Sequence, residues 1–419
     1  MTRELAGRRV LVVGLARSGK AAAEALVAEG ATVVGFDRDE ALEAGRLHDL
    51  GVEVHLGREE ETLLQGIDLV VKSPGVPGET LLVRGARARD LSVWSEIELG
   101  ARLLGNPILG VTGTNGKTTT TELLGAVFRV AGRPVEVAGN VGRPLTSLVG
   151  SADPDAWIVC ELSSFQLEDV ETLRPRVAVL LNLEPDHLDR HGTFEAYADT
   201  KLRVFARQTA DDTAVVPRGF ERVPGTGRRV EFAGDDALPA EPRIPGPHNR
   251  ENAAAATAAA RAAGIDDRAI ADALRTFEGV AHRIELVREL RGVRYVNDSK
   301  ATNVAAALRA LASFRGARLH VILGGRGKHE SYEPLAAAFK PGDRAYVIGE
   351  AAGEIERSLQ AGGVPFVHAL TLEGALDATA PAAAPGDVVL LSPACASFDQ
   401  FRDFETRGDA FRTLVEELP

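Results

Sequence analysis

The most informative part of this sequence reads Gly110-Val111-Thr112-Gly113-Thr114-Asn115-Gly116-Lys117-Thr118-Thr119-Thr120. The apolar run at 107–112 predicts a short buried strand, and a helix should begin at Lys117. The spacing Gly-x-x-x-x-Gly-Lys-Thr is that of a phosphate-binding loop, where backbone N–H groups and a helix N-terminus favour an anion. Lys117 adds a charge for the outer phosphates, and the Thr118 hydroxyl can ligate Mg²⁺. The stretch therefore predicts a site for Mg-ATP or a similar triphosphate rather than an ordinary turn.

Length and composition limit the classes of protein to which the chain can belong. A chain of 419 residues, 45% hydrophobic and 26% charged, is typical of a globular protein of two or three domains. The net charge of −12 argues against a nucleic-acid partner. Two cysteines, Cys160 and Cys395, exclude a disulfide framework and favour a reducing compartment. Because no signal-peptide pattern or membrane-length apolar run is visible, we expect a cytoplasmic protein with no membrane partner.

The N-terminal region predicts a nucleotide-binding βαβ unit. A strand at 9–14, a glycine-bounded turn, a helix at 20–29 and a strand at 31–36 precede Asp37. The middle glycine of the dinucleotide fingerprint is Ala16, which argues against NAD and leaves another nucleotide open. Asp37 suits a nucleotide contact or a simple strand-end turn, and the sequence leaves both possible.

Further strands are expected at 52–54 and 68–72. The rigid Ser73-Pro74-Gly75 loop follows the second of them, at a strand end where open α/β sheets bind ligands. A Pro-Gly turn without a ligand is the alternative. The first domain should close near 94–96.

Carboxylates and histidines follow the strands expected in the middle region. The strand at 156–161 ends on Glu161, where a Mg²⁺ ligand beside a phosphate loop would lie, although helix capping is an alternative. The strand at 176–182 leads to a charged loop containing His187, which suits a site role or a structural one. A helix carrying Lys201 comes next.

An alanine-rich helix is expected at 253–263, after an edge strand at 228–232. Asn249 and Asn252 precede it and are three residues apart, so they share one helix face. Their amides suit hydrogen bonds to a base edge or a helix cap, and the sequence leaves both open.

The remainder alternates strand and helix and predicts a second doubly wound parallel sheet. The expected strands lie at 294–296, 318–323, 345–348, 364–369 and 387–391. Polar loops follow three of these strands and should converge on one crevice, namely 297–303, 324–328 and 392–399. We therefore expect an α/β chain of three domains: a Rossmann-like domain at 1–95, a central phosphate-loop ATPase domain with a mostly parallel sheet at 96–280, and a Rossmann-like domain at 281–419.

Several motifs together resemble a known family. They are the phosphate loop 113–119, Glu161-Leu162-Ser163-Ser164-Phe165-Gln166-Leu167-Glu168, His248-Asn249 with Asn252, His282-Arg283, Asn297-Asp298-Ser299-Lys300-Ala301-Thr302-Asn303, and Ser392-Pro393-Ala394-Cys395-Ala396-Ser397-Phe398-Asp399-Gln400-Phe401. In this combination the whole chain resembles the ATP-dependent Mur ligases of peptidoglycan synthesis, and among them the D-glutamate-adding members.

The resemblance implies an activity and its substrates. It implies ATP-dependent formation of an amide bond through an acyl phosphate, in cytoplasmic peptidoglycan precursor synthesis. The substrates would be UDP-N-acetylmuramoyl-L-alanine, bound by the N-terminal domain, and D-glutamate, brought by the C-terminal domain. A monomer is expected.

The resemblance also implies roles for single residues. Catalytic roles fall on Lys117, Glu161, His187 and Lys201. Mg²⁺ would be held by Thr118, Glu161, His187 and Lys201, the last as a carbamate, although Lys201 could instead pair with nearby acids. ATP contacts fall on Gly113, Thr114, Asn115, Gly116, Lys117, Thr118, Thr119, Asn249, Asn252, Arg283 and Asp298; Arg283 could alternatively form a hinge salt bridge. The UDP-sugar would meet Leu15, Ala16, Asp37, Arg38, Ser73 and Asn140. D-Glutamate would meet Lys300, Thr302, Lys328, Ser397, Phe398 and Phe404.

Other functions remain as alternatives. A related ligase could add another acceptor, and a folylpolyglutamate synthase should lack the run 392–397. A nucleotide-switch ATPase without ligase activity would need neither Lys201 nor the C-terminal lysine and serine loops. A UDP-sugar oxidoreductase is disfavoured by Ala16 and by the intact phosphate loop.

Overall fold

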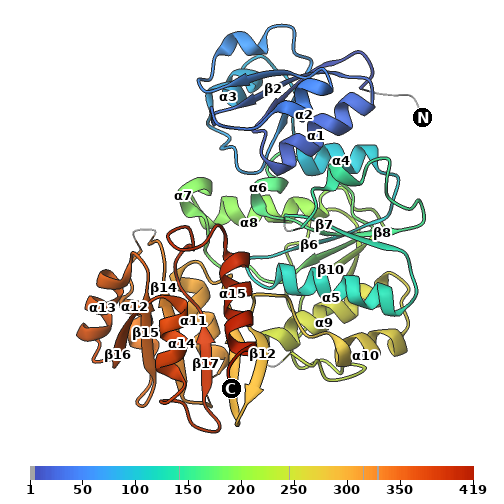
Figure 1. Ribbon diagram of the computed structural model, residues 1–419. Coiled ribbons are helices and arrows are strands. Elements are labelled where there is room, and N and C mark those ends of the chain that lie inside the picture. The colour runs from blue at the N-terminus through green and yellow to red at the C-terminus, as the bar shows by residue number, and fades with distance from the viewer. Residues whose placement is uncertain (1–4, 141, 245, 315, 328–329) are drawn as a thin grey trace. The chain divides into compact units, whose positions relative to one another are not determined.

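The computed structural model describes residues 5–419 apart from 141, 245, 315 and 328–329. These described residues form three β-sheets that helices cover (Figure 1). The chain divides into two compact units, Met1–Arg243 with His248–Phe277, and Ile244–Pro247 with Glu278–Pro419. The first unit contains the first two sheets and the second contains the third. The predicted α/β class is confirmed, while the boundaries at 95/96 and 280/281 stay predictions.

The first sheet is parallel, with strand order β3-β2-β1-β4-β5. Its strands are β1 (Arg9–Val13), β2 (Thr32–Asp37), β3 (Glu53–Leu56), β4 (Leu69–Lys72) and β5 (Val93–Ser95). Helices α1 (Arg17–Ala28), α2 (Gly45–Asp49), α3 (Leu81–Arg87) and α4 (Glu96–Leu103) follow strands β1, β2, β4 and β5. The strand order reverses between β1 and β4, and a crevice for ligands forms at such a point.

The middle sheet is also parallel, with strand order β11-β10-β9-β6-β8-β7. Its strands are β6 (Ile108–Thr112), β7 (Val135–Gly139), β8 (Trp157–Glu161), β9 (Val177–Leu180), β10 (Thr213–Pro217) and β11 (Arg228–Phe232). The helices are α5 (Lys117–Val130), α6 (Ser164–Leu167), α7 (Leu188–His191), α8 (Phe194–Leu202), α9 (Pro247–Ala262) and α10 (Asp267–Thr276). Strand β6 lies between β8 and β9, so residues at all three strand ends can meet at the phosphate loop.

The third sheet has the order β12-β13-β17-β14-β15-β16. Its strands are β12 (Glu285–Leu290), β13 (Val293–Asn297), β14 (Leu319–Gly324), β15 (Arg344–Ile348), β16 (Phe366–Leu370) and β17 (Val388–Leu391). The helices are α11 (Val304–Ser313), α12 (Glu333–Ala338), α13 (Ala352–Ala361), α14 (Leu372–Thr379) and α15 (Phe404–Glu416). All pairs are parallel except β12 with β13.

The structure corrects the sequence analysis at three strands and one helix start. The sequence analysis missed β12, an antiparallel edge strand that is only partly buried and therefore lacks a continuous apolar run. A tight turn joins it to β13, with φ of 52° at Arg291 and 77° at Gly292. Strands β5 and β10 were also missed. Helix α9 begins at Pro247, not at residue 253, because proline suits the first helical turn.

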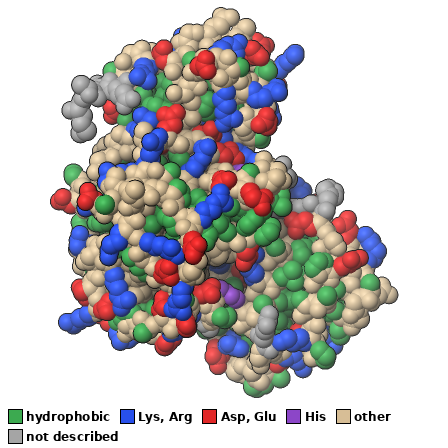
Figure 2. Space-filling model, turned by 180° about the vertical axis from the view of Figure 1, so that it is seen from behind, with side chains coloured by type: hydrophobic (Ala, Val, Ile, Leu, Met, Phe, Trp, Pro, Cys, Tyr) green, Lys and Arg blue, Asp and Glu red, His purple; other side chains and the backbone are tan. Residues whose placement is uncertain are grey.

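Charged side chains of both signs lie on the surface, and Figure 2 shows them interspersed over the face that it displays. Among the described residues, no helix combines the length and apolar character needed to cross a bilayer.

Two buried carboxylates join the first sheet to the middle one. Glu96 accepts hydrogen bonds from the Thr146 amide and hydroxyl, both at 2.7 Å. Glu98 accepts bonds from the backbone amides of residues 171, 172 and 173, at 2.8 to 3.0 Å, and from the Thr172 hydroxyl. Burial raises the pKa of Glu98, but its hydrogen bonds from Thr172, Glu171 and Arg102 together leave this pKa below its ordinary value. Glu98 therefore fixes the chain at 171–173 against α4.

We predict that Glu98→Gln destabilises the protein by about 2–4 kcal/mol, because the amide NH₂ would face backbone donors inside the fold. Urea unfolding followed by circular dichroism measures the change. Glu171→Gln is the matched control, since the Glu171 side chain belongs to the same junction but is 45% exposed, and it should cost less than about 1 kcal/mol. Equal losses in the two variants would contradict the structural role of Glu98.

Candidate active site

The phosphate loop lies between β6 and α5 in a conformation that needs its glycines. Gly113 has φ of 151° and Gly116 has φ of 84°, values that favour glycine. The Asn115 amide donates to Asn182 Oδ1 at 2.8 Å, and the Thr114 amide donates to the Asn182 carbonyl at 3.0 Å. The loop is thereby fixed at the N-terminus of α5, where the helix dipole and free N–H groups favour an anion.

The N-terminal end of α9 closes on this loop. A side chain at Gly116 would collide with the Asn252 amide, which is 7% exposed. Because α9 begins at Pro247, both Asn249 and Asn252 lie in its first turns and not before the helix. The structure thus brings Asn252 to the loop, as the ATP prediction requires, and leaves the role of Asn249 a prediction.

Two lysine amines share one acceptor in the loop. Lys117 Nζ and Lys201 Nζ each donate to the Gly113 carbonyl at 2.8 Å, and Lys117 Nζ also donates to the Thr114 carbonyl at 2.9 Å. Lys201 is 2% exposed, and its Nζ lies 4.8 Å from the centroid of the Tyr197 ring. Burial, reinforced by the charge of Lys117, lowers the pKa of Lys201 to about 6. The Lys201 amine is therefore mostly uncharged at neutral pH.

Glu161 supplies a carboxylate at the end of β8, beside β6. It is 2% exposed and its Oε1 accepts a hydrogen bond from Asn140 Nδ2 at 3.0 Å. Among the described residues its buried Oε2 has no hydrogen-bond partner. A buried carboxylate oxygen without a donor suits a cation, so this atom fits the predicted Mg²⁺ site. Thr118, in the first turn of α5, is buried as well.

His187 lies in the loop after β9, at the start of α7. Its side chain is exposed, its Nε2 is 3.5 Å from Asp186 Oδ2, and its ring centroid is 4.7 Å from that of Phe165. Within the described part of the chain, no group of three or more His, Cys, Asp or Glu side chains is placed to hold a metal. The predicted Mg²⁺ ligands include only two residues of those types, so their joint role stays a prediction.

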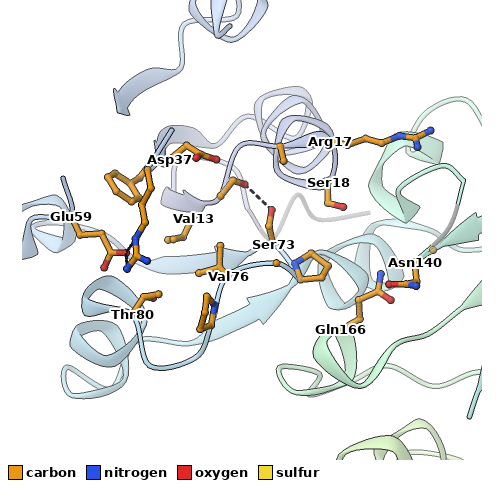
Figure 3. Close-up of a pocket in the computed structure, with 18 residues that line it drawn as sticks. Val13, Arg17, Ser18, Asp37, Glu59, Ser73, Val76, Thr80, Asn140 and Gln166 are labelled. Atoms are coloured by element: carbon orange, nitrogen blue, oxygen red, sulfur yellow. Dashed lines mark hydrogen bonds and ion pairs between the residues drawn. The ribbon is translucent and has the colours of Figure 1, made fainter. Parts of the chain in front are cut away.

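A cavity of about 440 Å³ lies at the point where the first sheet reverses its strand order (Figure 3). Of the predicted UDP-sugar contacts, five line it, namely Ala16, Asp37, Arg38, Ser73 and Asn140. Figure 3 shows Asn140 and Gln166 at one end of the cavity, and Asp37 and Glu59 at the other. Leu15 does not line the cavity, because its side chain is fully buried in the core.

Asp37 has a structural task as well. Its Oδ2 accepts a hydrogen bond from the Leu15 amide at 2.6 Å, and its Oδ1 accepts one from the Asp39 amide at 2.9 Å. The carboxylate therefore holds the turn after β1 while lining the cavity. The strand-end role and the ligand role, which the sequence left as alternatives, are compatible.

The polar loops of the third sheet gather around Arg407. This buried side chain donates to Ser299 Oγ at 2.9 Å and to the carbonyls of Ser299 and Cys395 at 2.8 and 3.2 Å. It thus joins the predicted loops after β13 and β17. Burial lowers the pKa of Arg407 to about 10, so it is charged at neutral pH.

Asp298 begins the loop after β13 and is buried. Burial raises the pKa of Asp298 to about 7, although Ser392 Oγ donates to its Oδ2 at 2.8 Å.

The residues predicted to bind D-glutamate differ in exposure. Ser397 is buried, Phe398 is 61% exposed, and Lys300 Nζ lies 5.8 Å from the Phe404 ring centroid. Thr302, whose amide donates to the Lys300 carbonyl, lies in the same loop. Lys328 lies outside the described residues. The assignment of this set stays a prediction.

The sequence analysis did not assign several residues that complete these sites. They are Asn182, which orders the phosphate loop, Gln166 and Glu59, which line the cavity, and Arg190 and Arg407, which bind backbone carbonyls. Gln166 lies inside a recognised motif and could have been found there. The two arginines contact residues distant in sequence, and no local pattern indicates such bonds.

Comparisons with known proteins all point to one family. Three family descriptions match successive parts of the chain, namely "Mur ligase MurD-like, N-terminal domain" over 8–95, "Mur ligase middle domain" over 111–229, and "Mur ligase, glutamate ligase domain" over 282–395. The chain is 43% identical to the UDP-N-acetylmuramoylalanine–D-glutamate ligase of Acidobacterium capsulatum, over 98% of this chain and 97% of that one. It is 46% identical to the enzyme of the same name from Anaeromyxobacter dehalogenans, over 99% and 98%.

Solved structures share the fold at lower identity. The UDP-N-acetylmuramate-alanine ligase of Thermotoga maritima matches with a TM-score of 0.59 and 19% identity, over 97% of this chain and 99% of that one. The UDP-N-acetylmuramoylalanyl-D-glutamyl-2,6-diaminopimelate–D-alanyl-D-alanyl ligase of Acinetobacter baumannii matches with a TM-score of 0.60 and 17% identity, over 93% and 90%.

We predict that the lowered pKa of Lys201 makes the stability of the protein depend on pH. Between the folded pKa of about 6 and the unfolded value of about 10.4, unfolding takes up a proton at Lys201. The free energy of unfolding should therefore rise with pH, by up to about 1.4 kcal/mol per pH unit from this group. Urea unfolding of wild type and Lys201→Met in CO₂-free buffer between pH 6.5 and 9 measures it. The variant should show the shallower slope, and parallel slopes would contradict a neutral buried amine.

Proposed function

The chain belongs to the Mur ligase family, and we propose that the residues around its phosphate loop carry out the D-glutamate-adding reaction of that family. It is an ATP-dependent ligase that joins the amino group of D-glutamate to the alanyl carboxylate of UDP-N-acetylmuramoyl-L-alanine. The observation that carries the site assignment is the meeting of the Lys117 and Lys201 amines at the Gly113 carbonyl, beside a buried carboxylate.

The first step activates a carboxylate. An oxygen of the alanyl carboxylate attacks the γ-phosphorus of ATP, the bond to the β-phosphate oxygen breaks, and an acyl phosphate and ADP form. Lys117 and the N–H groups at the start of α5 hold the β- and γ-phosphates and neutralise charge that develops during the transfer. The acyl phosphate supplies a good leaving group, which a free carboxylate lacks.

Mg²⁺ would be held by Thr118, Glu161, His187 and Lys201. The unpartnered Oε2 of Glu161 supports this assignment, and the ion would supply positive charge to the phosphate oxygens. The lysine takes part only if it is converted from an amine into an anion. Its low pKa supports this conversion, because an uncharged amine can react with CO₂ to give a carbamate.

The second step forms the amide bond. The D-glutamate amine attacks the acyl carbon, the carbon–oxygen bond to phosphate breaks, and inorganic phosphate leaves. We assign D-glutamate to Lys300, Thr302, Lys328, Ser397, Phe398 and Phe404, because cations and hydroxyls suit a dicarboxylate. Arg283 and Asp298 stay predicted contacts of ATP.

The UDP-sugar belongs, on this proposal, in the cavity of the first sheet. The end of the cavity lined by Asp37 and Arg38 suits the nucleotide. The end lined by Asn140 and Gln166 is formed by segments that follow strands of the middle sheet, where we place phosphate transfer. Both nucleotide substrates occur in the cytoplasm, which supports a cytoplasmic location. A monomeric state remains a prediction.

We predict that phosphate release from Mg-ATP requires both UDP-N-acetylmuramoyl-L-alanine and D-glutamate. L-Glutamate, L-lysine and meso-diaminopimelate should not replace D-glutamate. Lys117→Ala should lower kcat by more than about 100-fold, because the Lys117 ammonium would no longer stabilise the negative charge on the transferred phosphoryl group. Lys20→Ala, on α1 and outside the cavity, is the matched control and should keep the wild-type rate. Equal turnover with L-lysine would contradict the proposed acceptor, and a fully active Lys117→Ala variant would remove Lys117 from the mechanism.

We predict that Lys201 forms a carbamate in bicarbonate buffer. Carbon-13 NMR of protein in ¹³C-bicarbonate should show a carbamate resonance that is absent from Lys201→Arg. The signal should weaken as the pH falls through about 6, because the ammonium form of Lys201 cannot attack CO₂. An identical resonance in the variant would assign the modification to another amine and contradict the proposal.

A further inference from the structure

Arg190 contacts two segments that the proposed function treats separately. It lies on α7, three residues after His187, and its side chain is 16% exposed. Its guanidinium reaches the loop of the first sheet that lines the cavity, residues 73–78, which we call the cavity loop. It also binds Glu168, which follows α6. One side chain thus joins the cavity loop, α6 and residues 187–191, which we call the His187 segment.

The first set of contacts holds the cavity loop. Arg190 Nη1 donates to the Pro74 carbonyl at 3.2 Å, and Nη2 donates to the Val76 carbonyl at 3.1 Å. On its other side, the loop is tied to the first sheet through Ser73, whose amide donates to the Val13 carbonyl at 3.0 Å and whose hydroxyl donates to the Gly14 carbonyl at 2.7 Å. The cavity wall is therefore fixed by its own sheet and by Arg190.

The second set of contacts is a bidentate ion pair with Glu168. Arg190 Nε donates to Oε1 at 3.1 Å and Nη2 donates to Oε2 at 2.7 Å. The fully buried Lys72 at the end of β4 binds the same carboxylate at 2.9 Å. Burial by itself raises the pKa of Glu168, but the Arg190 hydrogen bond and the Lys72 charge leave this pKa below its ordinary value. Glu168 is thus an anion that holds Arg190 in one orientation.

The third contact brings in the His187 segment. The Arg190 guanidinium carbon lies 4.0 Å from the centroid of the Phe165 ring. The same ring is 4.7 Å from the His187 ring and stacks on the His191 ring at 5.7 Å with an interplanar angle of 11°. A shift of the guanidinium therefore changes the packing around His187 as well as the cavity loop.

We propose that Arg190 is a positioning residue that couples occupancy of the cavity to the arrangement of the His187 segment. This inference rests on the proposed function, in which the cavity takes the UDP-sugar and His187 serves phosphate transfer. A guanidinium presents its donors in a rigid plane, so Arg190 cannot release the cavity loop without disturbing its contacts with Glu168 and Phe165. Binding of the UDP-sugar and of the ATP analogue should therefore favour each other, and such coupling is reciprocal.

The experiment compares Arg190→Lys with Arg87→Lys in the full-length protein. Lysine keeps the charge but cannot bind two carbonyls, a carboxylate and a ring face in one plane. Arg87 is the matched control, because it crosses the same junction, with Nη2 at 2.6 Å from Asp169 Oδ1 and Nη1 at 3.3 Å from the Gly78 carbonyl, and neither bond reaches α7.

Calorimetry measures the affinity for UDP-N-acetylmuramoyl-L-alanine with and without a saturating non-hydrolysable ATP analogue and Mg²⁺. In wild type and in Arg87→Lys the analogue should tighten binding by at least about fivefold. In Arg190→Lys this factor should fall to about one. The KM for the UDP-sugar should rise about tenfold or more, because hydrogen bonds from a charged donor are lost, while the KM for D-glutamate should not change.

The outcomes separate this inference from the proposed function. An Arg190→Lys variant with wild-type coupling, an equal loss in Arg87→Lys, or a wild type without coupling would overturn the inference. Because calorimetry needs no turnover, a wild type that binds both nucleotides but forms no amide would contradict the proposed function alone. If Arg190→Lys unfolds, Glu168→Gln provides the same test, since it weakens the ion pair that orients Arg190 and should also lower the coupling factor.

Discussion

The carbonyl oxygen of Gly113 accepts hydrogen bonds from the amines of Lys117 and Lys201, each at 2.8 Å. Two ammonium groups at this distance from one acceptor would repel each other strongly inside a protein. The conflict is relieved because burial and the charge of Lys117 remove the proton from Lys201. Lys201 is thus a mostly neutral amine at neutral pH. The roles proposed for the two residues rest on this shared acceptor.

The parallel middle sheet is what allows this arrangement. Strand β6 lies between β8 and β9, so the chain segments after all three strands reach the same edge of the sheet. From there Glu161 supplies a carboxylate and Asn182 orders the loop, while Asn252 approaches from α9. Glycine is favoured at 116 because φ is 84° there, and a Cβ would also displace the Asn252 amide. These residues are distant in sequence: Glu161 ends β8, Asn182 follows β9, and Asn252 lies on α9.

The parts of this structure that the sequence predicted are those with a local physical signature. Apolar runs predicted strands β1, β6 and β8, and the glycine spacing predicted the phosphate loop. Strand β12 was missed because a half-exposed edge strand has no such run. The start of α9 was missed because only the alanine-rich run from residue 253 was interpreted as helical, although the helix begins at Pro247. Arg190 and Arg407 could not be found, because the backbone carbonyls that they bind are brought close only by the folded chain.

These two arginines address the same physical problem in different sheets. Loops at the ends of parallel strands have carbonyl groups that no neighbouring strand satisfies, and a buried carbonyl without a donor is costly. A guanidinium has five N–H donors in one plane and satisfies several such carbonyls at once. Arg190 binds two carbonyls of the cavity loop, and Arg407 binds those of Ser299 and Cys395. Because a lysine offers its donors from a single atom, it could not replace either side chain. Loops at the ends of these strands can therefore be irregular in backbone while their carbonyls are still satisfied.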